Sequence, residues 1–424
     1  MTAVNEIHER NEGCSIMERV VLTSFARTPF SSQNGKEFQE LSLPNLALTP
    51  MKAAMERSRL GKGDVDGVIA GVMDQHGEGG NIARYLALQA GLDAETATGY
   101  TLNRICGSGF TTVTNSMMEL WTGQGNVYVA VGAEMNSHRL ISLPLSFAWT
   151  GIPRGGIKLG GGGGGATAPP EYGDTSPMGT VENAAKIYGV TREESDFFAY
   201  ESQMKAKRAQ DEGRLAVEIV PIEVPQTDKK GKVTTAVHDK DLHLKPYTQL
   251  DVLATLKPVY QEDGVITAGN ASGSVDGAAS VVLMTESEAK RRELPPIAYL
   301  NDFTFVGVDP RVLGTGPAPA IQKLLKKTGL TLDDIDLFEV NEAFAAQVLS
   351  VMKILNVDFE SSFYKKLNPN GGGVSIGHPE GGTGVRLTMT VAEELRRTGK
   401  RLGVCSACIG GGMGVAILLE NAQI

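Results

Sequence analysis

The amino-acid sequence predicts an α/β protein in which one structural unit occurs twice. Amphipathic segments with helical spacing alternate with apolar, strand-like runs. The order helix, strand, corner, helix, strand occurs once in each half of the chain, at nearly equal spacing. The 51 glycines among 424 residues cluster where tight loops would join such elements. This length is sufficient for two or three domains with a large buried core.

In the first half, the repeated unit begins with an amphipathic helix in "LALTPMKAAMERSRL" and an apolar strand after the acidic "DVD". The corner "NRICGSGF" follows and leads into a second helix, "TTVTNSMMELWTGQ". The strand "NVYVAVGAEM" completes the unit. Cys106 therefore lies at a glycine-rich corner that opens a helix.

The second half follows the same plan. Its first helix lies in "PAPAIQKLLKKTG", and "DID" precedes the strand "LFEV". The corner "SIGHPEGGTGVRL" leads into the helix "TMTVAEELRRTGK" and the β-like run "RLGVCSACIGGGMGVAILL". His378 thus occupies the position that matches Cys106. If the halves pack about a pseudo-twofold axis, these two corners face each other.

The region between the halves differs in character from both. It holds a helix pair, whose second helix begins with a capping box at Thr191 and Glu194, and a charged segment. It also holds the run Gly160–Gly165, for which we expect a surface loop because no "GK[ST]" follows to make a phosphate cradle. We expect a leader at 1–18, a first half at 19–137, an inserted loop domain at 138–262, the end of the first half at 263–290 and a second half at 291–424.

Composition excludes several classes of protein. A net charge of −9 argues against a nucleic-acid binder, which would carry a basic face. No apolar run approaches the length of a membrane span, and the N-terminus lacks the pattern of a secretory signal. Four cysteines in 424 residues do not make a disulfide framework. We therefore expect a cytoplasmic protein with no nucleic-acid or membrane partner.

Cys106 and His378 are candidate reactive groups. A cysteine is often a small buried hydrophobe, but the free N–H groups of a helix start lower a thiol pKa and favour a nucleophile. A lone histidine is often structural, yet a base at the matching corner is what nucleophilic thiol chemistry requires. Both interpretations stay open for each residue on these grounds.

Cys405 and Cys408 form the motif "CSAC". A redox dithiol would normally open a helix, whereas residues three apart on a strand point to opposite faces. A zinc site would need about four ligands, and no second cysteine pair is present. We expect Cys405 to be packed and Cys408 to be the candidate for chemistry. Asn341, in "VNEAFAAQ", is either a helix cap or a polar group directed at the site.

Seven blocks of the sequence resemble the thiolase family, in the family's order: "NRICGSGF", "VGAEMNS", "MGTVENAA", "TAGNASGSVDGAA", "VNEAFAAQ", "GGGVSIGHPEGGTG" and "CIGGGMG". The resemblance runs from about Arg19 to the C-terminus. It implies a thiolase fold, a five-layered αβαβα core of two similar halves with an inserted loop domain. It also implies coenzyme A thioesters as substrates, a homodimer or homotetramer, and neither a cofactor nor a metal.

The resemblance also implies roles for individual residues. Cys106 is the nucleophile that carries the acyl group, His378 accepts its proton, Cys408 is the second acid/base, and Asn341 holds a water of an oxyanion hole. The backbone N–H groups of Cys106 and Gly410 form the second hole. Five positions match the lining of the pantetheine channel: Met178, Ala268, Ser272, Ala343 and Phe344.

The sequence departs from the family pattern at Glu380, where many members have an aliphatic residue, at Val275 and at Pro177. We predict an acyltransferase that cleaves 3-oxoacyl-CoA with coenzyme A or runs the reverse Claisen condensation. A degradative enzyme for medium or unusual acyl chains and a biosynthetic enzyme making acetoacetyl-CoA are both open. The alternatives are a ketoacyl-synthase-like condensing enzyme and a non-catalytic subunit with the same fold.

Overall fold

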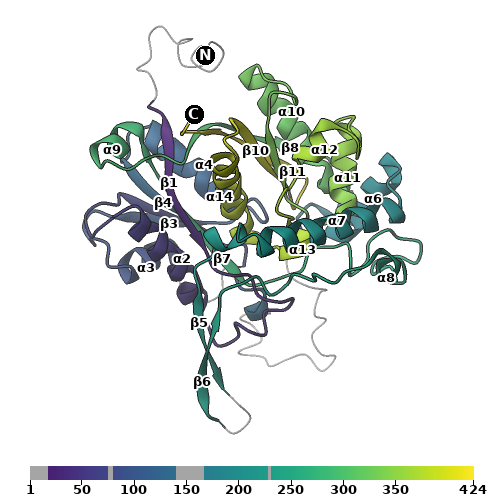
Figure 1. Cartoon of the computed structure of the whole chain (residues 1–424), viewed down its shortest axis with the longest axis horizontal. Helices are drawn as coiled ribbons and strands as arrows, with labels where there is room; N and C mark the ends of the chain where they lie inside the picture. The colour runs from purple at the N-terminus through teal and green to yellow at the C-terminus, as the bar shows by residue number, and fades with distance from the viewer. Residues whose placement is uncertain (1–17, 75–79, 140–166, 228–230) are drawn as a thin grey trace.

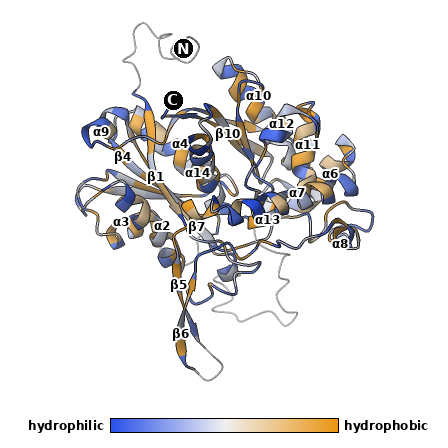
Figure 2. Cartoon of the chain, viewed as in Figure 1, coloured by the Kyte–Doolittle hydropathy of each residue, from blue (hydrophilic) through white to orange (hydrophobic). Residues whose placement is uncertain are grey.

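The structure, a computed structural model, describes residues 18–74, 80–139, 167–227 and 231–424 (Figure 1). The run Gly160–Gly165 and nearly all of the predicted leader lie outside these residues. The first strand, β1 (Val20–Arg27), consists of eight buried residues, and Figure 2 shows the hydrophobic residues along it. Such a run is typical of a strand covered on both faces.

The nine strands of the main sheet, within the described residues, pair in the order β3-β2-β4-β7-β1-β8-β11-β10-β9. Two half-sheets meet at its centre, where β1 and β8 share three residue pairs. The remaining strands are β2 (Gly67–Gly71), β3 (Thr98–Leu102), β4 (Val127–Glu134), β7 (Gly277–Thr285), β8 (Ala298–Gly307), β9 (Leu337–Val340), β10 (Leu402–Ile409) and β11 (Met413–Asn421).

The two half-sheets have the same strand order, which confirms the predicted repeat. Outward from the centre, the first half runs β1, β7, β4, β2, β3, and the second runs β8, β11, β10, β9. A parallel bridge between Phe338 and Leu367 stands where β3 stands in the first half. Three helix pairs also correspond: α2 (Leu43–Arg57) with α10 (Pro317–Thr328), α3 (Ile82–Gln89) with α11 (Ala345–Ile354), and α4 (Ser108–Trp121) with α14 (Glu380–Thr398).

Three apolar cores separate the layers, because side chains alternate between the two faces of each strand. Val21 and Val68 pack with α2 and α3 on the outer face of the first half-sheet. Ile69 packs with α4 and α14 on its inner face, together with residues of β10 and β11. A third core joins α10 and α11 to the outer face of the second half-sheet. The α4–α14 pair is thus the middle of five layers, as the resemblance implied.

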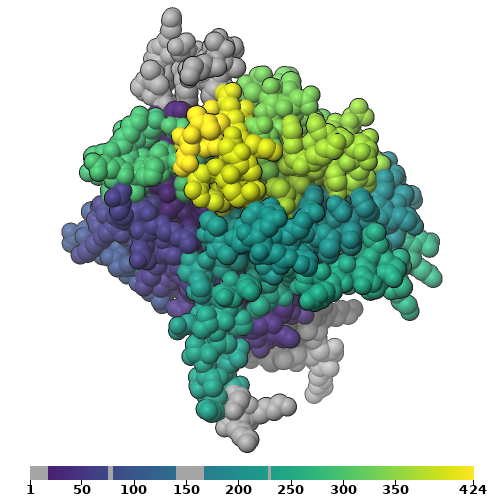
Figure 3. All heavy atoms as spheres, in the orientation of Figure 1, coloured from purple at the N-terminus to yellow at the C-terminus, as the bar shows by residue number. Residues whose placement is uncertain are grey.

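The region between β4 and β7 contributes no strand to the main sheet in its described part. It contains α6 (Pro177–Tyr188), α7 (Arg192–Asp211), α8 (Leu250–Ala254) and a hairpin of β5 (Ile222–Thr227) and β6 (Val233–His238). The hairpin projects from the body of the protein (Figure 1). Figure 3 shows this region, in teal, lying between the purple first half and the green-to-yellow second half. The predicted capping box is present: Glu194 N–H donates to the Thr191 hydroxyl, and Thr191 N–H donates to the Glu194 carboxylate.

Shorter helices connect the main elements: α9 (Glu286–Arg291), α12 (Ser362–Lys366), α13 (Gly373–Ile376) and the 3₁₀ turns η1 (Asn136–His138), η2 (Pro170–Tyr172), η3 (Leu215–Val217) and η4 (Pro310–Thr315). Among the described residues, no helix has the length and apolarity that a membrane crossing needs. The N-cap of α7 and the C′ glycines of α6, α10 and α14 follow ordinary helix-end chemistry.

Candidate active site

The starts of α4 and α14 are in backbone contact. A Cβ atom built on Gly109 would lie 2.7 Å from the carbonyl oxygen of Gly381, and one on Gly384 would lie 2.1 Å from the nitrogen of Phe110. Only glycine permits this approach. Cys106 precedes α4 by two residues and His378 precedes α14 by two. The predicted meeting of the two corners is therefore confirmed.

The Cys106 corner is strained and tightly packed. Ile105, a β-branched residue, has φ +51°, a conformation that such residues rarely adopt and that occurs often at functional sites. A Cβ on Gly107 would lie 2.4 Å from the Ile409 side chain, and one on Gly410 would lie 3.1 Å from that of Ile105. The corner thus interlocks with the turn after β10, and the Gly410 N–H donates a hydrogen bond to the Cys106 thiol.

The resting Cys106 is a thiol. Burial raises its pKa well above the ordinary value, and the charge of Glu380 and the neighbouring Cys408 thiol raise it further. The Gly410 N–H acts in the opposite direction. The expectation that the helix start lowers this pKa is wrong, because withdrawal from water opposes the thiolate more strongly than the local donors support it.

His378 is held in a single tautomer by its neighbours. Its Nδ1 lies 2.6 Å from Thr383 Oγ1, and that hydroxyl donates to the Pro379 carbonyl at 2.9 Å. Since the hydroxyl proton is used there, Nδ1–H must be the donor to Thr383. Nε2 therefore carries the lone pair and faces Asn341 Nδ2 at 3.4 Å. Burial lowers the His378 pKa, so the imidazole is neutral near pH 7 and can accept a proton.

Asn341 is directed at His378 and is not a helix cap. It directly follows β9, its N–H donates to the Ser406 carbonyl at 2.8 Å, and α11 begins four residues later with Phe344 as N-cap. The side-chain oxygen of this buried residue has no hydrogen-bond partner within the described structure. Of the two interpretations of Asn341, the structure supports the polar group directed at the site.

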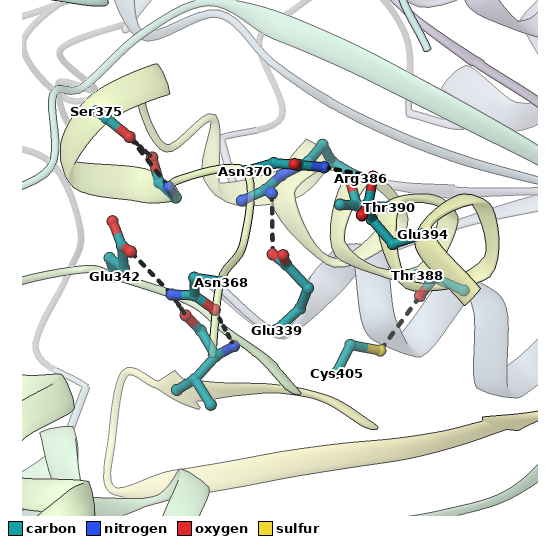
Figure 4. Close-up of polar contacts among 12 residues, drawn as sticks. Glu339, Glu342, Asn368, Asn370, Ser375, Arg386, Thr388, Thr390, Glu394 and Cys405 are labelled. Atoms are coloured by element: carbon teal, nitrogen blue, oxygen red, sulfur yellow. Dashed lines mark hydrogen bonds and ion pairs between the residues drawn. The ribbon is translucent and has the colours of Figure 1, made fainter. Parts of the chain in front are cut away.

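A buried polar cluster fixes the turn that carries Asn341 (Figure 4). Val340 N–H donates to Asn368 Oδ1 at 2.8 Å, and Asn368 Nδ2 donates to Glu342 at 2.8 Å. Glu342 also accepts from Ser202 on α7 at 2.6 Å. Because these groups tie β9 to the inserted region, the Asn341 side chain sits on a rigid support.

Cys405 and Cys408 lie on opposite faces of β10, as predicted, and both are free. Cys405 packs in the middle-layer core with its sulfur 3.7 Å from the Thr388 hydroxyl (Figure 4). Cys408 is close enough to Cys106 for the two thiols to interact electrostatically, and burial raises its pKa to about 12. The two cysteines therefore do not form a dithiol pair, and only Cys408 is at the site.

The predicted channel residues lie in three places. Ala268 and Ser272 share one segment, Ala343 and Phe344 lie on the segment beside it, and Met178 lies at the start of α6. Ser272 N–H donates to the Ala343 carbonyl at 3.0 Å, and a backbone bridge pairs Ala271 with Phe344. The same segment reaches the reactive centre, where His378 N–H donates to the Gly273 carbonyl at 3.0 Å. Ala268 is exposed.

Met178, the remaining channel position, is 39% exposed on the first turn of α6. That helix packs on α11, which follows Phe344 directly.

One other sequence feature, Val275, has a clear place in the structure. Val275 is buried, and its side chain fills the space where Gly377, at φ +98°, would otherwise carry a Cβ. Thr383, Asn136 and Arg139 also contact the site, although the motifs did not single them out. Thr383 could have been predicted to contact His378, because its hydroxyl lies one turn into the helix that follows the histidine. Within the described residues, no cluster of three or more histidine, cysteine, aspartate or glutamate side chains could hold a metal ion.

Comparison with known proteins decides the family. Residues 20–287 match the thiolase N-terminal domain and residues 294–421 match the thiolase C-terminal domain. The chain belongs to the thiolase family. Every candidate reactive position described above falls within these two matches.

Similar thiolases are known over nearly the whole chain. An acetyl-CoA acetyltransferase of Rhizobium meliloti (strain 1021) is 42% identical over 408 residues, 95% of this chain and 98% of the relative. A mitochondrial 3-ketoacyl-CoA thiolase of Mus musculus is 37% identical over 425 residues, 96% of this chain and 99% of the relative. The crystal structure of the human mitochondrial 3-ketoacyl-CoA thiolase superposes with a TM-score of 0.84 at 36% identity, covering 96% of this chain and 100% of that one.

Proposed function

We propose that this thiolase transfers an acyl group between coenzyme A thioesters through a thioester on Cys106. Two observations carry the proposal. The corners that hold Cys106 and His378 are in backbone contact, and Cys408 lies close enough to Cys106 to act on its pKa. Two soft thiols and one neutral imidazole supply a nucleophile and two acid/base groups. Acyl transfer by covalent catalysis needs this set.

In thiolysis, the Cys106 sulfur attacks the 3-oxo carbon of a 3-oxoacyl-CoA, and its proton passes to Nε2 of His378. The bond between C2 and C3 then breaks. The shortened acyl group stays on Cys106, and the departing acetyl-CoA carbanion takes the proton of Cys408. Coenzyme A attacks the thioester next and gives its thiol proton to the Cys408 thiolate. Acyl-CoA leaves, and the released Cys106 sulfur takes its proton back from His378. The condensation follows the same steps in reverse.

The resting protonation states suit this sequence of steps. Since burial keeps Cys106 protonated and His378 neutral, the proton moves as the sulfur attacks and no charged pair needs to wait in the site. The tetrahedral oxyanion requires donors. We assign this role to the N–H groups of Cys106 and Gly410 and, around the enolate, to the imidazolium with an Asn341-held water.

Coenzyme A and acyl-CoA are the proposed substrates, with no cofactor or metal. A human mitochondrial 3-ketoacyl-CoA thiolase has been solved in complex with CoA, and it is 35% identical with a TM-score of 0.83. We place the pantetheine arm along Met178, Ala268, Ser272, Ala343 and Phe344. The relatives are named both acetyltransferase and 3-ketoacyl-CoA thiolase, so chain length is left to experiment.

A homo-oligomer is the proposed assembly. Within the described strands, β3 pairs only with β2 and ends the sheet, which leaves an edge on which a second copy can add its own β3. Apolar groups beside this edge are exposed: Tyr100 on β3 at 36% and Met118 on α4 at 42%. An isologous dimer would cover them. We also propose a reducing compartment, the cytoplasm, because Cys106, Cys405 and Cys408 are all free thiols.

The test is to identify the acyl group on the enzyme. Incubation with acetoacetyl-CoA and with a longer 3-oxoacyl-CoA, followed by mass spectrometry of peptides, should show acylation of Cys106. The Cys106→Ser variant should lose it, and Cys408→Ala should still be acylated by an acyl-CoA yet fail to condense. Cys405→Ala is the matched control and should retain turnover. A folded Cys106→Ser variant with full thiolysis would refute the role of Cys106. Absence of thiolysis in the native protein would return a non-catalytic subunit to consideration.

A further inference from the structure

Glu380 lies at the point where the two reactive corners meet. It is the first residue of α14 and follows His378 by two positions. Its carboxylate accepts from Arg139 Nη2 at 2.8 Å through one oxygen and from Asn136 Nδ2 at 2.9 Å through the other. The Glu380 side chain is only 13% exposed, so this is a largely buried ion pair and not a solvated surface charge.

The surroundings of the Glu380 carboxylate are held in place by hydrogen bonds to the segments after β4 and before β7. Asn136 also donates to the Val275 carbonyl at 2.8 Å, which ties the segment after β4 to the one before β7. A second carboxyl group, that of Glu134 at the end of β4, accepts from the N–H groups of Gly381 and Met73 at 3.0 Å each. Burial and the Glu380 charge raise the pKa of Glu134 to about 8. The first turn of α14 is therefore clamped to β4 and cannot shift without breaking several buried hydrogen bonds.

The Glu380 charge acts on both reactive groups. It raises the pKa of Cys106 and the pKa of His378, because a negative charge favours the protonated form of each. The other charged groups that face His378 are Arg386 on α14 and Arg139 after η1, and both lower its pKa. The groups that face Cys106 are Cys408 on β10 and Glu134, and both raise its pKa.

We propose that Glu380 is a positioning residue for proton transfer, holding a fixed negative charge that stabilises the His378 imidazolium formed when Cys106 attacks. This inference rests on the proposed acyl-transfer function. Burial opposes a cation at His378, and Asn341 contributes a dipole but no compensating charge. The Glu380 carboxylate, two residues after His378 in the chain, supplies that negative charge. Hydrogen bonds from Arg139 and Asn136 keep the carboxylate from turning into solvent.

The same charge discourages a free thiolate on Cys106. The enzyme thus keeps its proton on the sulfur until substrate is present, which protects the thiol from alkylation and oxidation because the thiolate is the reactive form. Glu380 therefore coordinates two effects: low reactivity of the resting thiol and a favourable imidazolium in the reaction.

The experiment compares Glu380→Gln with the native protein by two pH profiles. The first is the rate of Cys106 alkylation by iodoacetamide, with Cys106→Ser as background, which needs no substrate. The second is kcat/KM for thiolysis. In Glu380→Gln, we expect the alkylation inflection and the acid limb of kcat/KM both to move to lower pH by about one unit, and kcat/KM at its optimum to fall about tenfold. Glu380→Asp, which keeps the charge, should stay close to the native profile.

Glu393→Gln is the matched control, because Glu393 is a buried carboxylate of the same helix, paired with Arg396 at 2.7 Å and remote from the reactive groups. Its profiles should not move. If Glu380→Gln fails to fold, Arg139→Gln is the second variant. Asn136 still holds the Glu380 carboxylate there, so loss of the Arg139 charge should move the acid limb of kcat/KM upward, the opposite direction. If both pH profiles of a folded Glu380→Gln enzyme with intact thiolysis kept their native inflections, the inference about Glu380 would be overturned and the proposed function would stand. Absence of thiolysis in the native enzyme would overturn the proposed function, while the alkylation profile would still report on Glu380.

Discussion

Gly384→Ala tests whether the contact between α4 and α14 sets the alignment of the reactive groups. A methyl group at this position would lie 2.1 Å from Phe110 N and 2.6 Å from the carbonyl carbon of Gly109, both backbone atoms. Ordinary contact needs about 3.5 Å, so one helix must move by about 1.4 Å. Neither neighbour is a flexible side chain that could rotate away.

The magnitude follows from that displacement. Cys106 and His378 each lie two residues before one of these helices, so a shift of the helices misplaces the nucleophile relative to its base. A misplacement of about 1 Å costs about 100-fold in rate. Overpacking also destabilises the fold by about 1–3 kcal/mol, against a gain of about 1 kcal/mol from alanine in a helix.

The assay pairs urea unfolding with the single-turnover rate of Cys106 acylation by acetoacetyl-CoA. Gly382→Ala is the control on the same helix, because its methyl group would meet its neighbours at 3.4 Å, an ordinary contact. We expect Gly382→Ala to acylate at nearly the native rate and Gly384→Ala about 100-fold more slowly. A folded Gly384→Ala enzyme that acylates within threefold of the native rate would refute the alignment argument.

Two further predictions concern groups that support the site and the fold. Thr383→Val removes the acceptor that fixes the His378 tautomer. A hydrogen bond to a charged imidazolium contributes about 1.5–3 kcal/mol, so its loss should lower kcat about 10- to 100-fold, and Thr383→Ser should restore the rate. Equal rates for the two variants would contradict the tautomer assignment. Arg27 is fully buried between Glu218 at 2.8 Å and Asp241 at 2.7 Å, so Arg27→Met should lower the free energy of unfolding by about 3–5 kcal/mol, measured by urea denaturation; a loss below 1 kcal/mol would show that the pair contributes little.

Local pattern was sufficient for much of the fold. The helix around "MKAAMERS", the strand β4 and the capping box at Thr191 each depend on residues close in sequence, and each is present. The repeat was visible for the same reason, since both copies carry the same periodicity. Cys106 and His378 could be paired from the sequence because they occupy equivalent corners of that repeat.

The sequence could not predict the role of groups whose partners lie far away in the chain. Glu380 was recognisable as a departure from the family pattern, but its partners Arg139 and Asn136 lie more than two hundred residues earlier in the chain. The direction of the Cys106 pKa shift was predicted wrongly for a related reason. A helix start is a local feature, whereas burial depends on what the rest of the chain places around the sulfur.

The sequence by itself determined the alternation of helices and strands, the two similar halves and the thiolase family, and it named the candidate reactive residues. Those properties depend on short-range periodicity and on side-chain chemistry at motif positions. Only the tertiary structure decided the protonation state of Cys106, the tautomer of His378 and the place of Glu380. Each is an electrostatic property, and electrostatic energy depends on distance and burial in space, which no local stretch of sequence specifies.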